Sequence, residues 1–191
     1  MACVNMDEKF ILFEGRPEKD LCLPIEGPVY DFLDDLGIEY KTLKHPAAFS
    51  IEECNRVRDC IQAPVFKNLF LTNKQQTRFY LLVMPGEKVF KTKYLSAQIN
   101  SARLSFADED HMKRYLGVTP GSVTPLGLIH DKDHTVNLLL DSDLQDYPVF
   151  ACHPCINSAS VVMHLEDLVS RVIPATGHTF QWVTLPTPPL E

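Results

Sequence analysis

Two apolar runs separated by a short polar segment constrain the fold of this chain most strongly. Residues 65–71 and 78–84 are rich in aromatic and β-branched side chains, and Asn73-Lys74-Gln75-Gln76 lies between them. This pattern predicts a β-hairpin. Lys67 interrupts the first run, and an ammonium among apolar neighbours costs desolvation unless it pairs or faces a cleft. Lys67 is therefore either a solvent-facing position at a sheet edge or part of a functional site.

Short helices and strands alternate irregularly along the rest of the chain. Apolar residues at helical spacing predict helices over residues 28–36, 51–59, 91–99, 108–116 and 164–172. Short apolar runs predict strands over residues 40–43, 102–106, 126–130, 135–140, 148–152, 158–163 and 179–184. Hairpins mixed with scattered helices indicate an α+β fold, because they lack a regular alternation of strand and helix.

The length of 191 residues fits one domain with a buried core. We expect residues 1–26 to form an N-terminal extension, residues 27–184 the domain, and residues 185–191 a Pro-rich tail. No apolar run approaches the ~20 residues that span a bilayer, and the first nine residues do not resemble a signal peptide. We therefore expect a cytoplasmic protein with no membrane partner.

The charge balance argues against one class of nucleic-acid binding. The formal net charge is -7, whereas a protein that coats long DNA or RNA normally carries a basic balance, because phosphate neutralisation dominates its affinity. We therefore expect no DNA partner. Gripping a single RNA end needs only a few local cations, so this kind of binding remains open.

Familiar catalytic motifs are absent: the sequence has no GxSxG, GxxxxGK[ST], GxGxxG or HExxH. Cys152-His153-Pro154-Cys155 has the CxxC spacing of zinc ligands, but a structural zinc site commonly takes four ligands and no second pair exists. We therefore expect no metal and no cofactor, and we interpret the cysteines as reduced thiols. A thiol-based redox or metal role for Cys152 and Cys155 is the alternative.

Two polar segments in the second half of the chain are candidates for chemistry. Gly121 and Ser122 follow a proline in a loop, where glycine lets N–H groups converge on an anion or a developing oxyanion. A plain turn is the alternative interpretation. His153 and Asn157 flank a turn between two predicted strands. This histidine is either structural or, together with Asn157, part of a polar pocket.

Five segments, taken together and in order from about residue 27 to 172, resemble the YbaK/prolyl-tRNA synthetase-associated domain family. The strongest marks are Lys-Asn-Leu-Phe-Leu and the His-Pro-x-x-Asn turn. In chain order the segments are His45-Pro46 with Phe49-Ser50-Ile51-Glu52-Glu53, Lys67-Asn68-Leu69-Phe70-Leu71, Ser105-Phe106-Ala107, Gly121-Ser122-Val123-Thr124-Pro125 with Leu126-Gly127-Leu128, and His153-Pro154-Cys155-Ile156-Asn157-Ser158-Ala159-Ser160. Residues 62–66 depart from the Gly/His-containing approach to the lysine that many members have.

The resemblance implies a single domain with a mixed, curved β-sheet flanked by helices and an active site in a cleft. It implies a trans-editing deacylase that binds the acceptor end of mischarged tRNA(Pro), with prolyl-tRNA synthetase as a further partner. Asn68 after Lys67 looks most like the branch that removes alanine. Deacylation of Cys-tRNA(Pro) or of another small aminoacyl-tRNA stays open, as does a non-catalytic tRNA-binding sensor of the same fold.

The resemblance also assigns roles to residues. Lys67, Gly121 and His153 are the catalytic candidates: the lysine would hold a phosphate or the terminal adenosine, the glycine amide would stabilise the oxyanion, and the histidine would orient substrate or water. The same small volume should hold all three. The substrate-binding candidates are Asn68, Ser122, Asn157, Ile51 and Phe49. Ile51 and Phe49 are candidates for the wall that sets selectivity, with core packing as the alternative.

Overall fold

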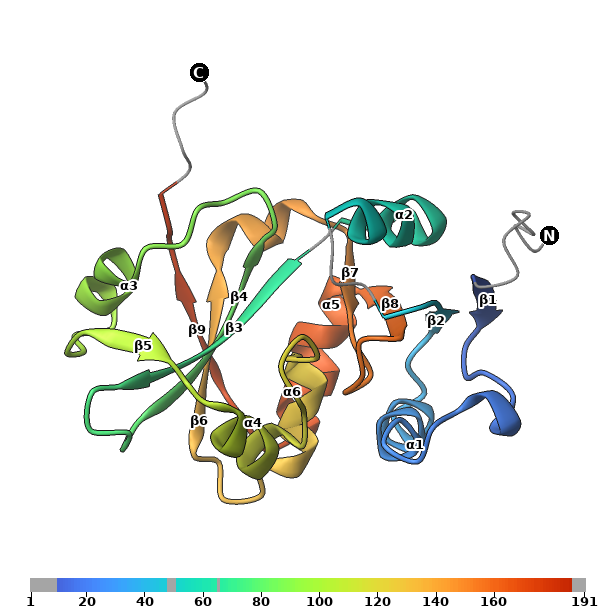
Figure 1. The fold of residues 1–191 in the computed structure, drawn as a ribbon, viewed down its shortest axis with the longest axis horizontal. Coiled ribbons are helices and arrows are strands. Elements are labelled where there is room, and N and C mark those ends of the chain that lie inside the picture. The colour runs from blue at the N-terminus through green and yellow to red at the C-terminus, as the bar shows by residue number, and fades with distance from the viewer. Residues whose placement is uncertain (1–9, 48–50, 65, 187–191) are drawn as a thin grey trace.

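The computed structural model describes residues 10–47, 51–64 and 66–186, without the side chains of residues 51–54. Two β-sheets enclose the main core (Figure 1). Sheet A is antiparallel, with the strand order β1 (Ile11–Glu14), β2 (Tyr40–Lys44), β8 (Ala159–His164) and β7 (Val149–Cys152). Sheet B is mixed, with the order β5 (Leu104–Phe106), β3 (Phe66–Asn73), β4 (Phe79–Pro85), β6 (Val136–Asp141) and β9 (Phe180–Val183).

Helices surround the two sheets. α1 lies beside β2 at the N-terminal end of the molecule, and α3 lies with β5 at the opposite end (Figure 1). The helices are α1 (Gly27–Asp35), α2 (Ile51–Ile61), α3 (Thr92–Gln98) and α4 (Glu109–Leu116), followed by the consecutive turns α5 (Leu165–Asp167), η4 (Leu168–Val172) and α6 (Ile173–Ala175). The described residues also form the short 3₁₀ segments η1 (Lys19–Leu21), η2 (Pro125–His130) and η3 (Ser142–Asp146).

The predicted hairpin is confirmed. β3 and β4 pair antiparallel from Phe66 opposite Pro85 to Thr72 opposite Phe79. Asn73 closes the turn, because its Oδ1 accepts from the amides of Thr77 and Arg78 at 2.9 and 3.1 Å. The polar segment between the two apolar runs thus ends the strands through side-chain hydrogen bonds.

The α+β prediction is also confirmed, but the strands form two sheets where the family resemblance implies one. The reason lies after β6, where Asp141 caps the 3₁₀ segment η3 by accepting from the amide of Asp143 at 3.0 Å. This turn redirects the chain, so that β7 pairs with β8 in sheet A instead of extending sheet B.

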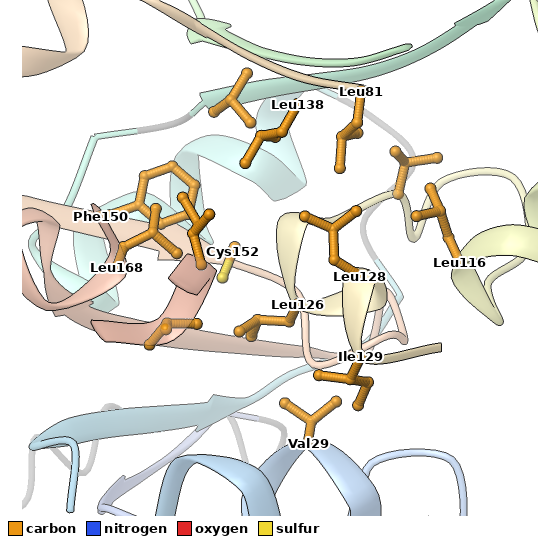
Figure 2. Packing of buried hydrophobic residues seen from close by; sticks show 14 of the residues in the cluster. Val29, Leu81, Leu116, Leu126, Leu128, Ile129, Leu138, Phe150, Cys152 and Leu168 are labelled. Carbon is orange, nitrogen blue, oxygen red and sulfur yellow. The ribbon is translucent and has the colours of Figure 1, made fainter. Parts of the chain in front are cut away.

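The predicted strand over residues 126–130 is wrong, because this stretch forms the 3₁₀ segment η2. Thr124 caps it by accepting from the amide of Leu126 at 3.3 Å, and Pro125 occupies the first helical turn, where its missing N–H costs nothing. Figure 2 shows Leu126 and Leu128 of this segment in the middle of the core, with Ile129 facing Val29 of α1. A short, mostly apolar run of this kind does not distinguish a strand from a buried helical turn.

The segment before α1 contributes to sheet A and to a buried ion pair. β1 forms the edge strand of the sheet, paired antiparallel with β2. Glu26 is fully buried, and its carboxylate accepts from Lys44 Nζ at 2.7 Å, from the Tyr30 hydroxyl at 3.0 Å and from the Leu23 amide at 2.8 Å. Such a charge is tolerated because each oxygen has a partner. None of the described helices has the length and apolarity that a membrane crossing requires.

Candidate functional site

A small cavity of about 80 Å³ lies where α2, β3 and the turn between β7 and β8 meet. One part of its wall is apolar and the other is polar. The apolar lining is Val57, Ile61, Pro64, Phe66, Ala151 and Cys152, and the polar lining is His45, Arg58, Asn68, His153 and Ser160. Convergent polar groups in a largely apolar hollow are typical of a small-molecule or catalytic site.

His153 follows β7 and is held in one tautomer. Its Nδ1 lies 3.0 Å from the carbonyl oxygen of Ala159, and a carbonyl only accepts, so Nδ1 carries the proton and donates. Burial lowers the pKa of His153 below its usual range, and the bond to Ala159 offsets this only in part. In the neutral ring Nε2 is therefore an acceptor, and it makes no hydrogen bond with any residue that the structure describes.

His45, beside the end of β2, is a second neutral imidazole. Its Nδ1 donates to the carbonyl of Pro46 at 2.8 Å, so its Nε2 accepts from the Ser160 hydroxyl at 2.9 Å. Burial lowers its pKa, and a positive charge on nearby His153 would lower it further. His45 and Ser160 lie in segments that carry the family resemblance, yet neither is among the predicted site residues. The His45-Pro46 pair directly after a predicted strand was the sequence signal that could have identified His45 as a site residue.

Asn68 of β3 presents an unsatisfied oxygen. Its Oδ1 is buried and has no hydrogen-bond partner among the described residues, although the side chain lines the cavity. Leaving a buried acceptor unpaired costs about 1–3 kcal/mol, so such an atom in a cavity indicates a ligand that donates to it. The predicted substrate-binding residue Asn68 and the predicted catalytic residue His153 thus line the same cavity.

Lys67 does not line this cavity. Successive strand residues face opposite sides of a sheet, and Lys67 therefore opens onto the other face of sheet B. Its Nζ donates to the carbonyl of Lys88 at 2.7 Å, and its side chain lines a separate groove. The expectation that one small volume holds Lys67 and His153 is not met.

The Gly121 loop contributes one available donor, not two. Gly121 has φ +87°, the left-handed region that favours glycine, and a Cβ there would lie 3.5 Å from Asn157 Nδ2. The amide of Ser122 donates to the carbonyl of Thr119 at 3.0 Å and is therefore engaged in a turn. The amide of Gly121 makes no bond within the described ranges. Neither Gly121 nor Asn157 lines the 80 Å³ cavity, although Asn157 belongs to the turn that begins at His153.

The two selectivity candidates cannot be placed. Phe49 lies outside the described residues, and Ile51 begins α2 but has a side chain that is not described.

The thiols beside His153 are buried and protonated. Burial raises the pKa of Cys152 and of Cys155 to about 12. A thiol that keeps its proton is a weak nucleophile and a weak metal ligand. In the part of the chain that the structure describes, no three side chains of His, Cys, Asp or Glu gather in a metal-binding arrangement. The site as built does not use the CxxC spacing.

Known proteins resemble this chain over most of its length. The sequence model of the aminoacyl-tRNA editing domain matches residues 45–170. The chain is 35% identical over 153 residues to the prolyl-tRNA editing protein ProX of Acetoanaerobium sticklandii, which covers 80% of this chain and 93% of that protein. It is 32% identical over 151 residues to the prolyl-tRNA synthetase associated domain-containing protein 1 of Danio rerio, covering 78% and 81% of the two chains.

A solved structure gives the same fold. The crystal structure of a candidate trans-editing enzyme for prolyl tRNA synthetase superposes with a TM-score of 0.65 at 18% identity, covering 86% of this chain and 99% of the other. The sequence match extends over most of the domain and includes the residues that line the cavity from His45 to Ser160. The chain therefore belongs to the family of aminoacyl-tRNA editing domains.

Proposed function

We propose that this chain hydrolyses the ester between a wrongly attached small amino acid and the terminal ribose of tRNA(Pro), acting in trans. The observation that carries the proposal is the cavity that His153 and Asn68 both line, where Nε2 of His153 and Oδ1 of Asn68 have no hydrogen-bond partner among the described residues. Family membership and the names of the relatives, which are prolyl-tRNA editing and prolyl-tRNA synthetase associated proteins, support the same reaction. They also support prolyl-tRNA synthetase as a partner.

An aminoacyl ester is already activated, so its hydrolysis needs a placed water and a stabilised oxyanion. The hydrogen bond to Ala159 fixes the His153 ring. Nε2 can then accept a hydrogen bond from the attacking water or from a ribose hydroxyl. Asn68 Oδ1 accepts a second hydrogen bond, and the substrate ammonium or a ribose hydroxyl is suited to donate it. Gly121 lies outside the cavity but beside Asn157 of the turn that begins at His153. Its amide, which makes no bond within the described ranges, is our candidate for the oxyanion donor, a type of donor whose removal costs ~100–1000-fold in rate.

Lys67 has a supporting role in this proposal. Its ammonium lies on the outer face of β3, away from His153, so it does not take part in proton transfer. A compact charge at that place is suited to hold a phosphate of the tRNA.

The size of the cavity favours a small amino acid. About 80 Å³ accommodates several water-sized groups, since about 10–15 Å³ suffices for one. A synthetase site shaped for proline rejects smaller alanine poorly, because one missing methylene is worth only ~1–3 kcal/mol. A second site that is too small for proline solves this problem, and we propose alanine as the residue removed. Phe49 and Ile51 remain our candidates for the wall.

A deacylation panel tests the proposed function. Purified protein is incubated with Ala-, Cys-, Ser- and Pro-tRNA(Pro), and the remaining ester is measured over time. We expect Ala-tRNA(Pro) to be hydrolysed fastest and Pro-tRNA(Pro) to stay intact. Faster loss of the cysteinyl or seryl ester would overturn the alanine assignment. Tight binding of all four without any turnover would instead identify a sensor.

A further inference from the structure

A second and larger hollow lies on the outer face of sheet B. It has a volume of about 890 Å³ and is bounded by β3, by α3 with the segment before it, and by β5. Its lining residues are Lys67, Leu69, Phe90, Lys91, Thr92, Lys93, Ser96, Arg103 and Phe106. We call this hollow the α3–β5 groove. It occupies the end of the molecule remote from α1 (Figure 1).

The groove concentrates uncompensated positive charge. Four of its nine lining residues are cationic, and none is acidic. Within the described ranges Lys91, Lys93 and Arg103 form no ion pair, and Lys67 donates to a backbone carbonyl and to no carboxylate. The whole chain carries a net charge of -7, so this gathering runs against its overall balance. A local field of this kind attracts a polyanion.

Aromatic rings stand among these cations. Phe106 of β5 is 62% exposed, and its ring lies 6.3 Å from that of Phe90 at an angle of 65°. Tyr94 on α3 is also exposed, and Lys93 Nζ lies 4.8 Å from its ring centre. Exposed rings beside lysines and an arginine are the combination that binds unpaired nucleotides, because bases stack on the rings while the cations follow the phosphates. Paired bases could not use these rings.

The groove and the cavity lie back to back across one strand. Lys67 lines the groove and its neighbour Asn68 lines the cavity, since consecutive residues of β3 face opposite sides of the sheet. We infer that the α3–β5 groove binds an unpaired stretch of the same tRNA whose terminal ester enters the cavity. This inference rests on the proposed function, and it supplies the affinity for RNA that a cavity of about 80 Å³ cannot supply by itself.

Two double variants with the same change of charge test the cations. Lys91→Gln/Lys93→Gln alters the groove, and Lys74→Gln/Lys132→Gln alters two exposed lysines elsewhere. The affinity for uncharged tRNA(Pro) is measured at several salt concentrations. We expect the groove variant to bind at least about tenfold more weakly and to lose about 0.7 in the slope of log K against log salt for each phosphate contact removed. The control should stay within about twofold of the wild type. Equal affinities of the two double variants would overturn the inference.

A second pair of variants tests the contribution of the aromatic rings to RNA binding. Phe106→Ala should weaken tRNA binding and leave the salt slope unchanged, because stacking releases no counterions. Trp182→Ala removes another exposed ring of sheet B that lies outside the groove and should have no effect. If both variants bind like the wild type, the rings do not contact RNA and the inference fails.

A short substrate separates this inference from the proposed function. With alanyl-adenosine, which lacks the upstream strand, the groove variants should keep the wild-type kcat/KM, whereas their kcat/KM for Ala-tRNA(Pro) should fall about tenfold. Equal losses on both substrates would contradict the groove's role. If the wild-type protein hydrolyses neither substrate but still binds tRNA through Lys91 and Lys93, only the proposed function fails. If it hydrolyses both and the groove variants behave like their controls, only the groove fails.

Discussion

At the scale of single residues, the environment of His153 determines what its ring can do. The carbonyl of Ala159 accepts a hydrogen bond from Nδ1–H, and burial keeps the ring uncharged. In the same way, the neutral ring of His45 accepts a hydrogen bond from the Ser160 hydroxyl through its Nε2. Both rings stay neutral at pH 7 because their pKa values lie below the ordinary value of about 6.5. The cavity therefore offers acceptors, which suits placement of a water or a hydroxyl.

The pKa of His153 predicts the pH dependence of the reaction. A lowered pKa means that the acceptor form persists until the pH falls below 6.5, so kcat/KM, after spontaneous hydrolysis is subtracted, should change little between pH 8 and 7 and fall at pH values below 6.5. The measurement is a pH profile of Ala-tRNA(Pro) deacylation, corrected for spontaneous hydrolysis. A midpoint above pH 7 would show that the ring is not held neutral by burial.

At the scale of elements, Gly127 shows why η2 packs where it does. A Cβ at this position would lie 2.8 Å from the backbone oxygen of Leu116 at the end of α4, so only glycine allows this approach. This close packing of η2 against α4 places Leu126 and Leu128 of η2 in the centre of the core. It also fixes the place from which the Gly121 loop begins.

Gly127→Ala should therefore destabilise the protein. The new methyl group forces α4 and η2 apart, and overpacking of this kind costs about 1–3 kcal/mol in the free energy of unfolding. Gly27→Ala is the matched control, because nothing lies within 4 Å of its Cβ position, and it should stay within about 0.5 kcal/mol of the wild type. Urea unfolding measures both. Equal stabilities would mean that η2 and α4 do not pack this closely.

The elements also show how far sequence reasoning reaches. The β3–β4 hairpin follows from its apolar runs and the polar turn, and the structure has it in that place. The strand predicted over residues 126–130 failed because a continuous apolar run carries no period. Thr124 and Pro125 were the overlooked helical signals. The separation of Lys67 from the cavity could have been predicted, since a strand places neighbours on opposite faces. The sequence could not predict that Asn68 Oδ1 has no hydrogen-bond partner among the described residues, because this depends on contacts between distant segments.

At the scale of the whole molecule, sheet B separates the two hollows. A buried lysine links the segments around it: Lys88 Nζ forms an ion pair with Asp141 at the end of β6 at 2.8 Å and donates to the carbonyl of Leu185 at 2.9 Å. The backbone carbonyl of the same Lys88 accepts from Lys67. Burial alone would lower the pKa of Lys88, but Asp141 and Asp143 outweigh it and raise the pKa. The outer groove and the inner cavity are thus held on one rigid strand.

The central claim is that the cavity lined by His153 and Asn68 carries the hydrolysis. The most direct measurement is the single-turnover rate of Ala-tRNA(Pro) deacylation by the wild type and by His153→Ala and Asn68→Ala, with tRNA affinity determined in parallel. The account predicts that each variant loses at least about 100-fold in rate, the lower end of a single general-base or oxyanion hydrogen-bond contribution, and keeps the wild-type affinity. Wild-type rates in both variants would contradict it.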